Sequence, residues 1–280
     1  MRVYISVDME GIGGISHPHP TDPKDARYPI SVDLMVGEAN AAIEGAVAGG
    51  ATHILVNDSH ASMHNLPPEA ISPAATLLQG QKPWSMVAGA AQGFDVALFV
   101  GYHARAGHPR GTIAHTYSSR PVETRLDGRP TGEYGLNALV LGAWGIPVGL
   151  VTGDDALADE VATWLPWADR VVVKLADGGN SAESFHPLRA RGLVQAGAER
   201  AVRLAAAGVL EVLSVPSPVT IEVDYPRGVI ADHAAILPGA ERIGDRTVRL
   251  AFARLASHPR LRKKTGDEIG MARTVLELRR

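Results

Sequence analysis

Hydrophobic and polar residues alternate at the start of the chain. β-branched residues occupy every second position from Val3 to Val7, and this period of two is typical of a β-strand. Two acidic residues, Asp8 and Glu10, follow directly, and Gly11-Ile-Gly-Gly14 comes next. Because residues two apart on a strand point to the same side, the two carboxylates should lie together. Like charges repel at a partly buried position, so we predict a cation between them.

Further apolar runs alternate with segments of helical periodicity. The predicted strands cover residues 53–56, 96–100, 148–151 and 170–175. The predicted helices cover residues 31–48 with Ser31 as N-cap, a segment near 84–92, residues 133–144 and residues 155–165. Strands that alternate with helices are typical of an α/β fold with a doubly wound, mostly parallel sheet.

The pattern changes near residue 184. An Ala- and Arg-rich helix is predicted at about 187–207, and residues 219–223 alternate clearly. Such alternation suits a half-exposed strand of an antiparallel sheet. We therefore predict that residues 1–183 form a doubly wound α/β domain that carries the metal site. Residues 184–280 are predicted to form a second, smaller α+β domain.

Ligand-type side chains recur where the predicted strands end. In an open parallel sheet, ligands bind outside the carboxyl ends of the strands. One further carboxylate begins the helix after Thr131-Gly132, where the helix dipole favours an anion. The candidate metal ligands are Asp8 and Glu10 after the first strand, His60 after the second, His103 after the third, and Glu133.

The composition of this set narrows the choice of metal. The chain has no cysteine, so any site uses His and carboxylate ligands, which suit Zn or Mn. Five ligands exceed the four of a tetrahedral zinc site, and a carboxylate that bridges two metals accounts for the surplus. Two metals about 3.5–4 Å apart can activate a water and polarise a carbonyl or phosphoryl oxygen.

Each of these residues taken alone has a commoner structural role. Asp8 could be a turn former, the histidines could be ordinary surface or core residues, and Glu133 could be a first-turn carboxylate. Asp58 is either a partner that orients His60 or a turn residue. The convergence of the five at one sheet edge is what favours a metal site.

His115 lies twelve residues after His103. It could carry a proton or stabilise a developing oxyanion, or be a loop histidine.

The glycines at 11–14 do not complete a dinucleotide-binding motif, because Ser16 stands where the third glycine belongs.

Composition and charge limit the partners. The 280 residues are 45% hydrophobic and 20% charged with a net charge of −3, and aromatic residues make up 5%. This balance is that of a globular protein and argues against a nucleic-acid or membrane partner.

No apolar run reaches the length of about 18 residues that a membrane span needs. No signal peptide precedes the first strand, so a cytoplasmic location is expected.

Several motifs together resemble the DppA-type D-aminopeptidases, a family of zinc metallopeptidases. They are Ser6-Val-Asp-Met-Glu-Gly11, Asn57-Asp-Ser-His60, Gly101-Tyr-His-Ala104, His115-Thr-Tyr117 and Gly132-Glu-Tyr-Gly-Leu-Asn137. They cover the first half of the chain, whereas the second half matches in length and general pattern. One departure concerns Ala61 and His64, where the family commonly has Gly and Arg. This leaves the ligands intact but affects how the end of the substrate is recognised.

The resemblance implies specific roles for these residues. Asp8 would bridge two zinc ions, with Glu10 and His60 completing one site and His103 and Glu133 the other. His115 would be the catalytic histidine. The implied activity is metal-activated hydrolysis that releases an N-terminal D-amino acid from short peptides such as D-Ala-D-Ala. The implied assembly is a ring-shaped homodecamer.

Other functions remain open from the residues themselves. A two-metal phosphoesterase would need cations such as Arg105 or Arg110 near the metals. An aminopeptidase with a different stereochemical preference would have the same ligands. A small-molecule binding protein without enzymatic activity would need no clustered metal ligands.

Overall fold

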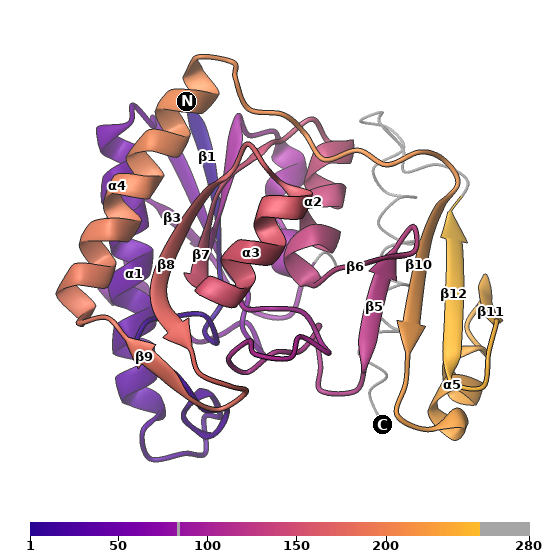
Figure 1. Ribbon diagram of the computed structural model, residues 1–280. Coiled ribbons are helices and arrows are strands. Elements are labelled where there is room, and N and C mark those ends of the chain that lie inside the picture. The colour runs from indigo at the N-terminus through magenta and orange to yellow at the C-terminus, as the bar shows by residue number, and fades with distance from the viewer. Residues whose placement is uncertain (83–84, 253–280) are drawn as a thin grey trace.

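Two β-sheets organise the protein, as the computed structural model shows for residues 1–82 and 85–252 (Figure 1). Within these residues, one sheet has seven strands in the order β3-β2-β1-β4-β7-β8-β9, and the other has five in the order β11-β12-β10-β5-β6. The first sheet consists of β1 (Arg2–Val7), β2 (His53–Asp58), β3 (Thr76–Leu78), β4 (Val96–Val100), β7 (Val148–Asp154), β8 (Asp169–Ala176) and β9 (Ala182–Ser184). The second consists of β5 (Glu123–Leu126), β6 (Arg129–Pro130), β10 (Val219–Asp224), β11 (Ala240–Arg242) and β12 (Thr247–Phe252).

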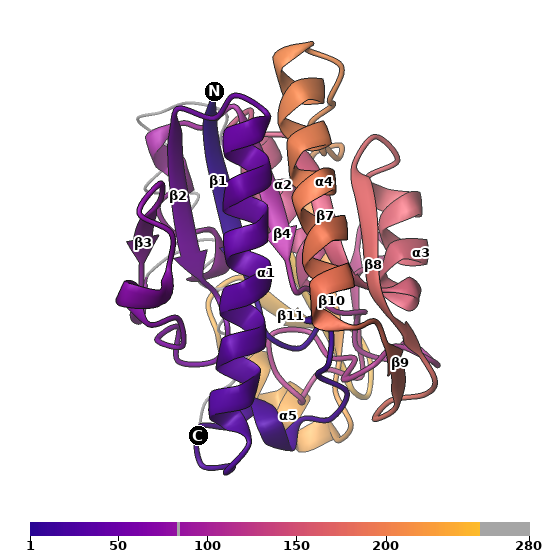
Figure 2. The same ribbon diagram turned by 90° about the vertical axis from the view of Figure 1, so that its left-hand side faces the viewer.

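Helices cover both faces of the first sheet. They are α1 (Tyr28–Ala48), α2 (Glu133–Ala143), α3 (Asp155–Trp164) and α4 (Pro187–Ala206), while α5 (Gly228–Ala234) lies by the second sheet. Helices α1 and α4 run side by side over one face (Figure 2), and α2 and α3 cover the other. The pairings from β3 to β8 are parallel, and β9 pairs antiparallel with β8. The predicted α/β fold with a doubly wound, mostly parallel sheet is confirmed.

The alternation in β1 divides its side chains between two cores. Val3, Ile5 and Val7 pack in the core beneath α1 and α4, whereas Tyr4 belongs to the core on the α2 side. Ser6 is also buried, and its hydroxyl lies 2.8 Å from the hydroxyl of Tyr102. The strand is therefore covered on both faces, and Asp8 follows directly at its carboxyl end.

The second sheet combines segments that are far apart in sequence. β10 pairs antiparallel with β5 and with β12, and its residues alternate between buried and half-buried, as predicted for residues 219–223. β5 and β6 precede residue 184, whereas α4 follows it and packs against α1. The domain division at residue 184 stays a prediction, and residues 253–280 of its second part lie outside the described residues.

Two predicted helices differ from the structure. Helix α1 begins at Tyr28 with Pro29 in its first turn, because the fixed φ of proline favours the first helical positions. Ser31 is therefore a buried residue inside the helix, not its cap. Instead of a helix near 84–92, two short 3-10 turns occur, Ser85–Val87 and Ala90–Gln92. They are separated by Gly89, whose φ of 83° interrupts the helical path; Trp84 lies outside the described residues.

One buried ammonium group holds the loop that follows β1. Lys174 on β8 has no exposed surface, and its Nζ donates hydrogen bonds to the carbonyl oxygens of Glu10, Ile12 and Ile15 at 2.5, 3.2 and 2.5 Å. Burial lowers the pKa of this ammonium to about 8. The carboxylate of Glu38 on α1 accepts a hydrogen bond from the Gly13 amide at 2.8 Å. The loop is thus fixed from both sides.

A glycine allows this loop to approach the end of β4. The Gly11 amide donates to the carbonyl of Gly101 at 2.8 Å. A Cβ at Gly11 would lie 1.8 Å from the carbonyl oxygen of Tyr102, a distance that no side chain permits. The absence of a side chain at this position brings the residues after β1 and β4 into contact.

No helix within residues 1–82 and 85–252 combines the length and the apolar character of a membrane span.

We predict that Lys174→Met lowers the free energy of unfolding by about 3 kcal/mol, because three buried carbonyl groups lose a charged donor. Denaturant unfolding monitored by circular dichroism measures this change. Lys24→Met is the matched control, since Lys24 is exposed and its replacement should change stability by less than about 0.5 kcal/mol. Equal stability of the two variants would contradict the role of Lys174.

Candidate metal centre

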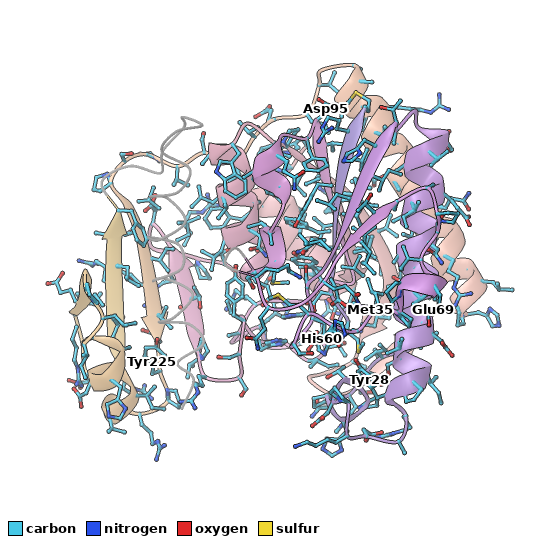
Figure 3. The ribbon with its side chains drawn as sticks, turned by 180° about the vertical axis from the view of Figure 1, so that it is seen from behind. Tyr28, Met35, His60, Glu69, Asp95 and Tyr225 are labelled. Carbon is cyan, nitrogen blue, oxygen red and sulfur yellow. The ribbon has the colours of Figure 1, made fainter. Side chains whose placement is uncertain are left out.

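Five candidate ligands meet at the carboxyl end of the parallel sheet. Asp8 and Glu10 follow β1, His60 follows β2, His103 follows β4, and Glu133 is the first residue of α2. All five are buried, with exposed fractions between 1% and 7%. Figure 3 shows His60 at this end of the sheet and Asp95 at the opposite end. The structure therefore brings together every residue that the sequence predicted as a metal ligand.

The backbone register accounts for this meeting. The Asp8 amide donates to the carbonyl of Val100 on β4, and the Ser59 amide donates to the carbonyl of Val7, both at 2.8 Å. Hydrogen bonding of β1 with each of its two neighbours, β2 and β4, thus continues one residue beyond the ends of the strands. Asp8 is held between the segments that carry His60 and His103.

Asp8 occupies the centre of the cluster. Its Oδ1 lies 3.4 Å from Nδ1 of His60, and its Oδ2 lies 3.5 Å from Nε2 of His103. The two oxygens of one carboxylate therefore face two different histidines. Glu10 Oε2 lies 2.9 Å from Nδ1 of His60, and Glu133 Oε1 lies 3.1 Å from Nε2 of His103. The cluster consists of two His-carboxylate pairs joined by Asp8.

Backbone carbonyls fix the orientation of both histidines. His60 Nε2 lies 3.0 Å from the carbonyl oxygen of Thr21, and His103 Nδ1 lies 3.0 Å from that of Ala104. Each imidazole thus has oxygen atoms next to both of its nitrogens, whereas a neutral imidazole carries one N–H. When that N–H donates to the carbonyl, the other nitrogen presents its lone pair toward the carboxylates. Only a proton or a metal ion can satisfy that arrangement.

The electrostatics of the cluster also require a positive charge. Burial, followed by the neighbouring Glu10 carboxylate, raises the pKa of Asp8 well above its usual range. Burial by itself lowers the pKa of His60, but Glu10 and Asp8 raise it well above the ordinary value. Burial by itself also lowers the pKa of His103, but the carboxylates of Glu133, Asp8 and Glu10 together raise it to about 10. Three buried carboxylates thus draw protons onto the histidines, and divalent cations would supply the same charge. The donor set fits zinc.

His115 lies beside this cluster on an irregular loop. Its ring stacks on that of His103, with centroids 4.0 Å apart and an interplanar angle of 11°. His115 Nδ1 is 2.9 Å from the carbonyl oxygen of Ile113. Ile113 and Tyr117 have φ values of 53° and 56°, which are uncommon for residues with a Cβ and costly for a β-branched one. The backbone is therefore constrained on both sides of His115.

The same loop contacts the last candidate ligand. The Tyr117 amide donates to Oε2 of Glu133 at 2.7 Å, and the Tyr117 hydroxyl lies 2.7 Å from Oδ1 of Asn137. With Oε2 engaged by the loop, Oε1 of Glu133 faces His103. One contact thus orients the Glu133 carboxylate and ties the loop that carries His115 to α2.

Asp58 has the turn role and not the role of a partner to His60. Its carboxylate accepts hydrogen bonds from the amides of Asn65 and Leu66 at 2.5 and 2.8 Å and from the Asn65 side chain at 2.7 Å. Asn65 in turn donates to the carbonyl of His60 at 2.7 Å. Sequence reasoning missed Asn65 and the carbonyl of Thr21, because every residue has a carbonyl and Asn is common in turns.

An open pocket leads to the cluster. We call it the acidic pocket; it has a volume of about 440 Å³. Its wall includes Asp8, Glu10, His60, His115 and Glu133. Arg105 does not line it and instead forms ion pairs with Glu123 and Glu160. Arg110 likewise pairs with Asp155 and Asp159. The two cations that a phosphoesterase would need are thus engaged elsewhere.

The chain is similar to known proteins of one family. The sequence profile of Peptidase_M55, described as D-aminopeptidase, matches residues 1–261. The chain is 36% identical over 251 residues to the D-aminopeptidase of Bacillus subtilis (strain 168), covering 89% of this chain and 90% of that protein.

A solved structure shares the whole fold. It is described as the Zn-dependent D-aminopeptidase DppA from Bacillus subtilis, a self-compartmentalizing protease. The match has a TM-score of 0.88 and 32% identity, and it covers 100% of this chain and 99% of that one. The resemblance predicted from the motifs is confirmed. The chain belongs to the Peptidase_M55 family of D-aminopeptidases.

Proposed function

We propose that this protein is a zinc-dependent aminopeptidase that releases the N-terminal D-amino acid from short peptides such as D-Ala-D-Ala, with two zinc ions in each chain. Family membership and the zinc dependence of the solved relative support the activity. The observation that carries the two-metal proposal is the position of Asp8, whose two oxygens face His60 and His103 separately.

The proposed ligands divide into two sets. Glu10 and His60 Nδ1 would hold one ion, and Glu133 and His103 Nε2 would hold the other, with Asp8 shared between them. When bound, such a pair polarises the carbonyl of the scissile bond and lowers the pKa of a bound water toward about 7. The carbonyls of Thr21 and Ala104 support this assignment, because they keep the ring nitrogens of His60 and His103 turned toward Asp8. Such outer contacts commonly orient metal-binding histidines.

His115 is the proposed proton carrier. Its Nδ1–H donates to the carbonyl of Ile113, which leaves Nε2 with a free lone pair. Burial, followed by the proximity of His103, lowers the pKa of His115, so the ring is neutral near pH 7. Nε2 then accepts the proton of the attacking water and passes it to the amine of the leaving group. This tautomer favours proton transfer over donation to an oxyanion.

We also propose that the chain assembles into a closed homo-oligomer, a ring-shaped decamer by the resemblance. The solved relative is described as self-compartmentalizing, and its match covers this whole chain. A cytoplasmic location stays a prediction.

The proposed activity predicts zinc-dependent cleavage of D-Ala-D-Ala. Zinc-loaded protein should hydrolyse this peptide and leave L-Ala-L-Ala intact, and chelator-stripped protein should hydrolyse neither. Chromatographic detection of released alanine measures both reactions. Cleavage of the L-peptide alone would retain a metallopeptidase and reject the D-specific assignment.

The bridging role predicts that Asp8→Asn loses both metal ions. The variant keeps the shape of the side chain but removes its negative charge and one oxygen. Zinc affinity should fall by more than about 100-fold at both sites, since contacts to ligands from outside the site already contribute 10–100-fold. Inductively coupled plasma mass spectrometry at fixed free zinc measures the content. Asp95→Asn at the opposite end of the sheet is the control, and normal zinc content in Asp8→Asn would reject the bridge.

The proton-carrier role predicts that His115→Ala keeps its zinc but loses turnover. The value of kcat for D-Ala-D-Ala should fall by about 10²–10⁴-fold, the usual contribution of a general acid-base group. Steady-state kinetics and metal analysis of the same sample separate the two effects. His233→Ala, on the exposed surface of α5, should behave like the unaltered protein. Loss of zinc in His115→Ala would indicate a ligand instead.

A further inference from the structure

A second pocket meets the acidic pocket at His115. We call it the side pocket; its volume is about 510 Å³. The two pockets share Glu10, His115 and Ser118 and extend from them in different directions. The acidic pocket reaches the segments after β2, whereas the side pocket reaches the loops after β4 and β8. The walls that belong to the side pocket alone include Pro18, His108, Ile113, Ala114, Gly179 and Asn180.

The two pockets differ in their relation to the proposed metal ligands. Four of the five ligands line the acidic pocket, namely Asp8, Glu10, His60 and Glu133. The side pocket reaches Glu10 alone among them. An aminopeptidase cleaves one residue from the amino terminus, so the amino end and the scissile carbonyl must lie by the ligands. The side pocket, which shares His115 with the acidic pocket, offers room for the remainder of the peptide.

The lining of the side pocket suits uncharged peptide groups. Among the described residues that form it, Glu10 is the one side chain with a full charge near pH 7. Burial, followed by the nearby Arg105, lowers the pKa of His108, so the imidazole of His108 is neutral near pH 7. Asn180 and His108 offer polar atoms beside the apolar surface of Ile113 and Ala114. A few polar groups in a mainly apolar wall are typical of sites that bind small ligands.

The backbone of one residue, Ile113, connects this pocket to His115. The Ile113 amide donates to the carbonyl of Gly179 at 2.7 Å, and the Ile113 carbonyl accepts from His115 Nδ1 at 2.9 Å. The wall formed by the 178–180 loop is therefore held at a fixed position relative to His115. A Cβ placed on Gly179 would meet no heavy atom within 4 Å, so there is open space at this wall.

We propose that the side pocket binds the leaving peptide, the residues that follow the scissile bond, while the acidic pocket takes the N-terminal D-residue. The proposal rests on the proposed aminopeptidase activity and assigns a substrate region to each side of His115. Gly179 and Asn180 are then specificity-determining residues, because they bound the space that the leaving peptide fills.

The test fills the side pocket and compares two substrates. D-Ala-Gly-Gly places a dipeptide in the side pocket, whereas D-alaninamide has ammonia as its leaving group and does not need the pocket. In Gly179→Phe, kcat/KM for D-Ala-Gly-Gly should fall about tenfold, which corresponds to about 1.4 kcal/mol. The value for D-alaninamide should stay within about twofold of that of the unaltered protein. Asn180→Phe provides a second, independent obstruction with the same expected pattern.

The matched control is Gly192→Phe. Gly192 is exposed on α4, its φ is not in the left-handed region, and a Cβ there also meets nothing within 4 Å. This variant should change neither substrate. Ser62→Phe obstructs the acidic pocket instead, and it should lower kcat/KM for both substrates.

A binding measurement separates this proposal from the proposed activity. Glycylglycine, the product that leaves D-Ala-Gly-Gly, should perturb the amide resonances of residues 108–114 and 178–180 in an NMR titration. Its affinity should fall about tenfold in Gly179→Phe. If the protein hydrolysed no D-peptide but glycylglycine bound in this way, the proposed function would fail, and the side pocket would still be shown to bind short peptides. Equal loss of both substrates in Gly179→Phe, or glycylglycine shifts confined to the acidic pocket, would overturn the assignment.

Discussion

Three carboxylates buried at one edge of a parallel sheet impose the constraint on which the site depends. Asp8, Glu10 and Glu133 are exposed by only 2–7%, so they would repel one another, and burial makes each charge costly. Positive charge must therefore be supplied locally. The histidines supply it through protonation or by holding metal ions, the amino terminus of α2 lies at Glu133, and the ammonium of Lys174 lies beneath the loop that carries Glu10. The segments after β2 and β4, together with β8 and α2, thus supply the positive charge that the three carboxylates require.

The division of tasks between side chains and backbone follows from this constraint. Side chains provide the atoms that could bind metal, and backbone carbonyls determine how those side chains are turned. Thr21, Ala104 and Ile113 each offer a carbonyl to a histidine nitrogen. A carbonyl has the same chemistry in every residue, so the orientation of the site depends on the path of the loops. Contacts such as Lys174 with the 10–15 loop and Asp58 with Asn65 hold those paths.

The convergence of the five candidate ligands could be predicted from the sequence because strand ends are easy to locate. Apolar runs identify the strands, parallel strands share one carboxyl edge, and the acidic and histidine residues follow directly. The same periodicity predicted α4 and the half-exposed strand β10. Other features could not be predicted, since they arise from contacts between distant segments. The pairing of β5 with β10 is one example, and the complete burial of Lys174 in β8 is another. Helix α1 begins at Tyr28, before the predicted cap Ser31, because Pro29 fits the first helical turn.

The backbone of Ile113 has a consequence for how this protein can evolve. Its N–H and C=O join the 178–180 loop to His115, and both contacts are made by backbone atoms that any residue other than proline possesses. Ile113 lines the side pocket, and its side chain takes no part in that connection. Mutations at this position can therefore change the shape of the wall while the geometry around His115 persists. A left-handed φ at this residue also makes Gly or Asn easy to accommodate. With the roles proposed for the side pocket and for His115, substrate preference can change among descendants of this chain while the position of His115 is inherited unchanged.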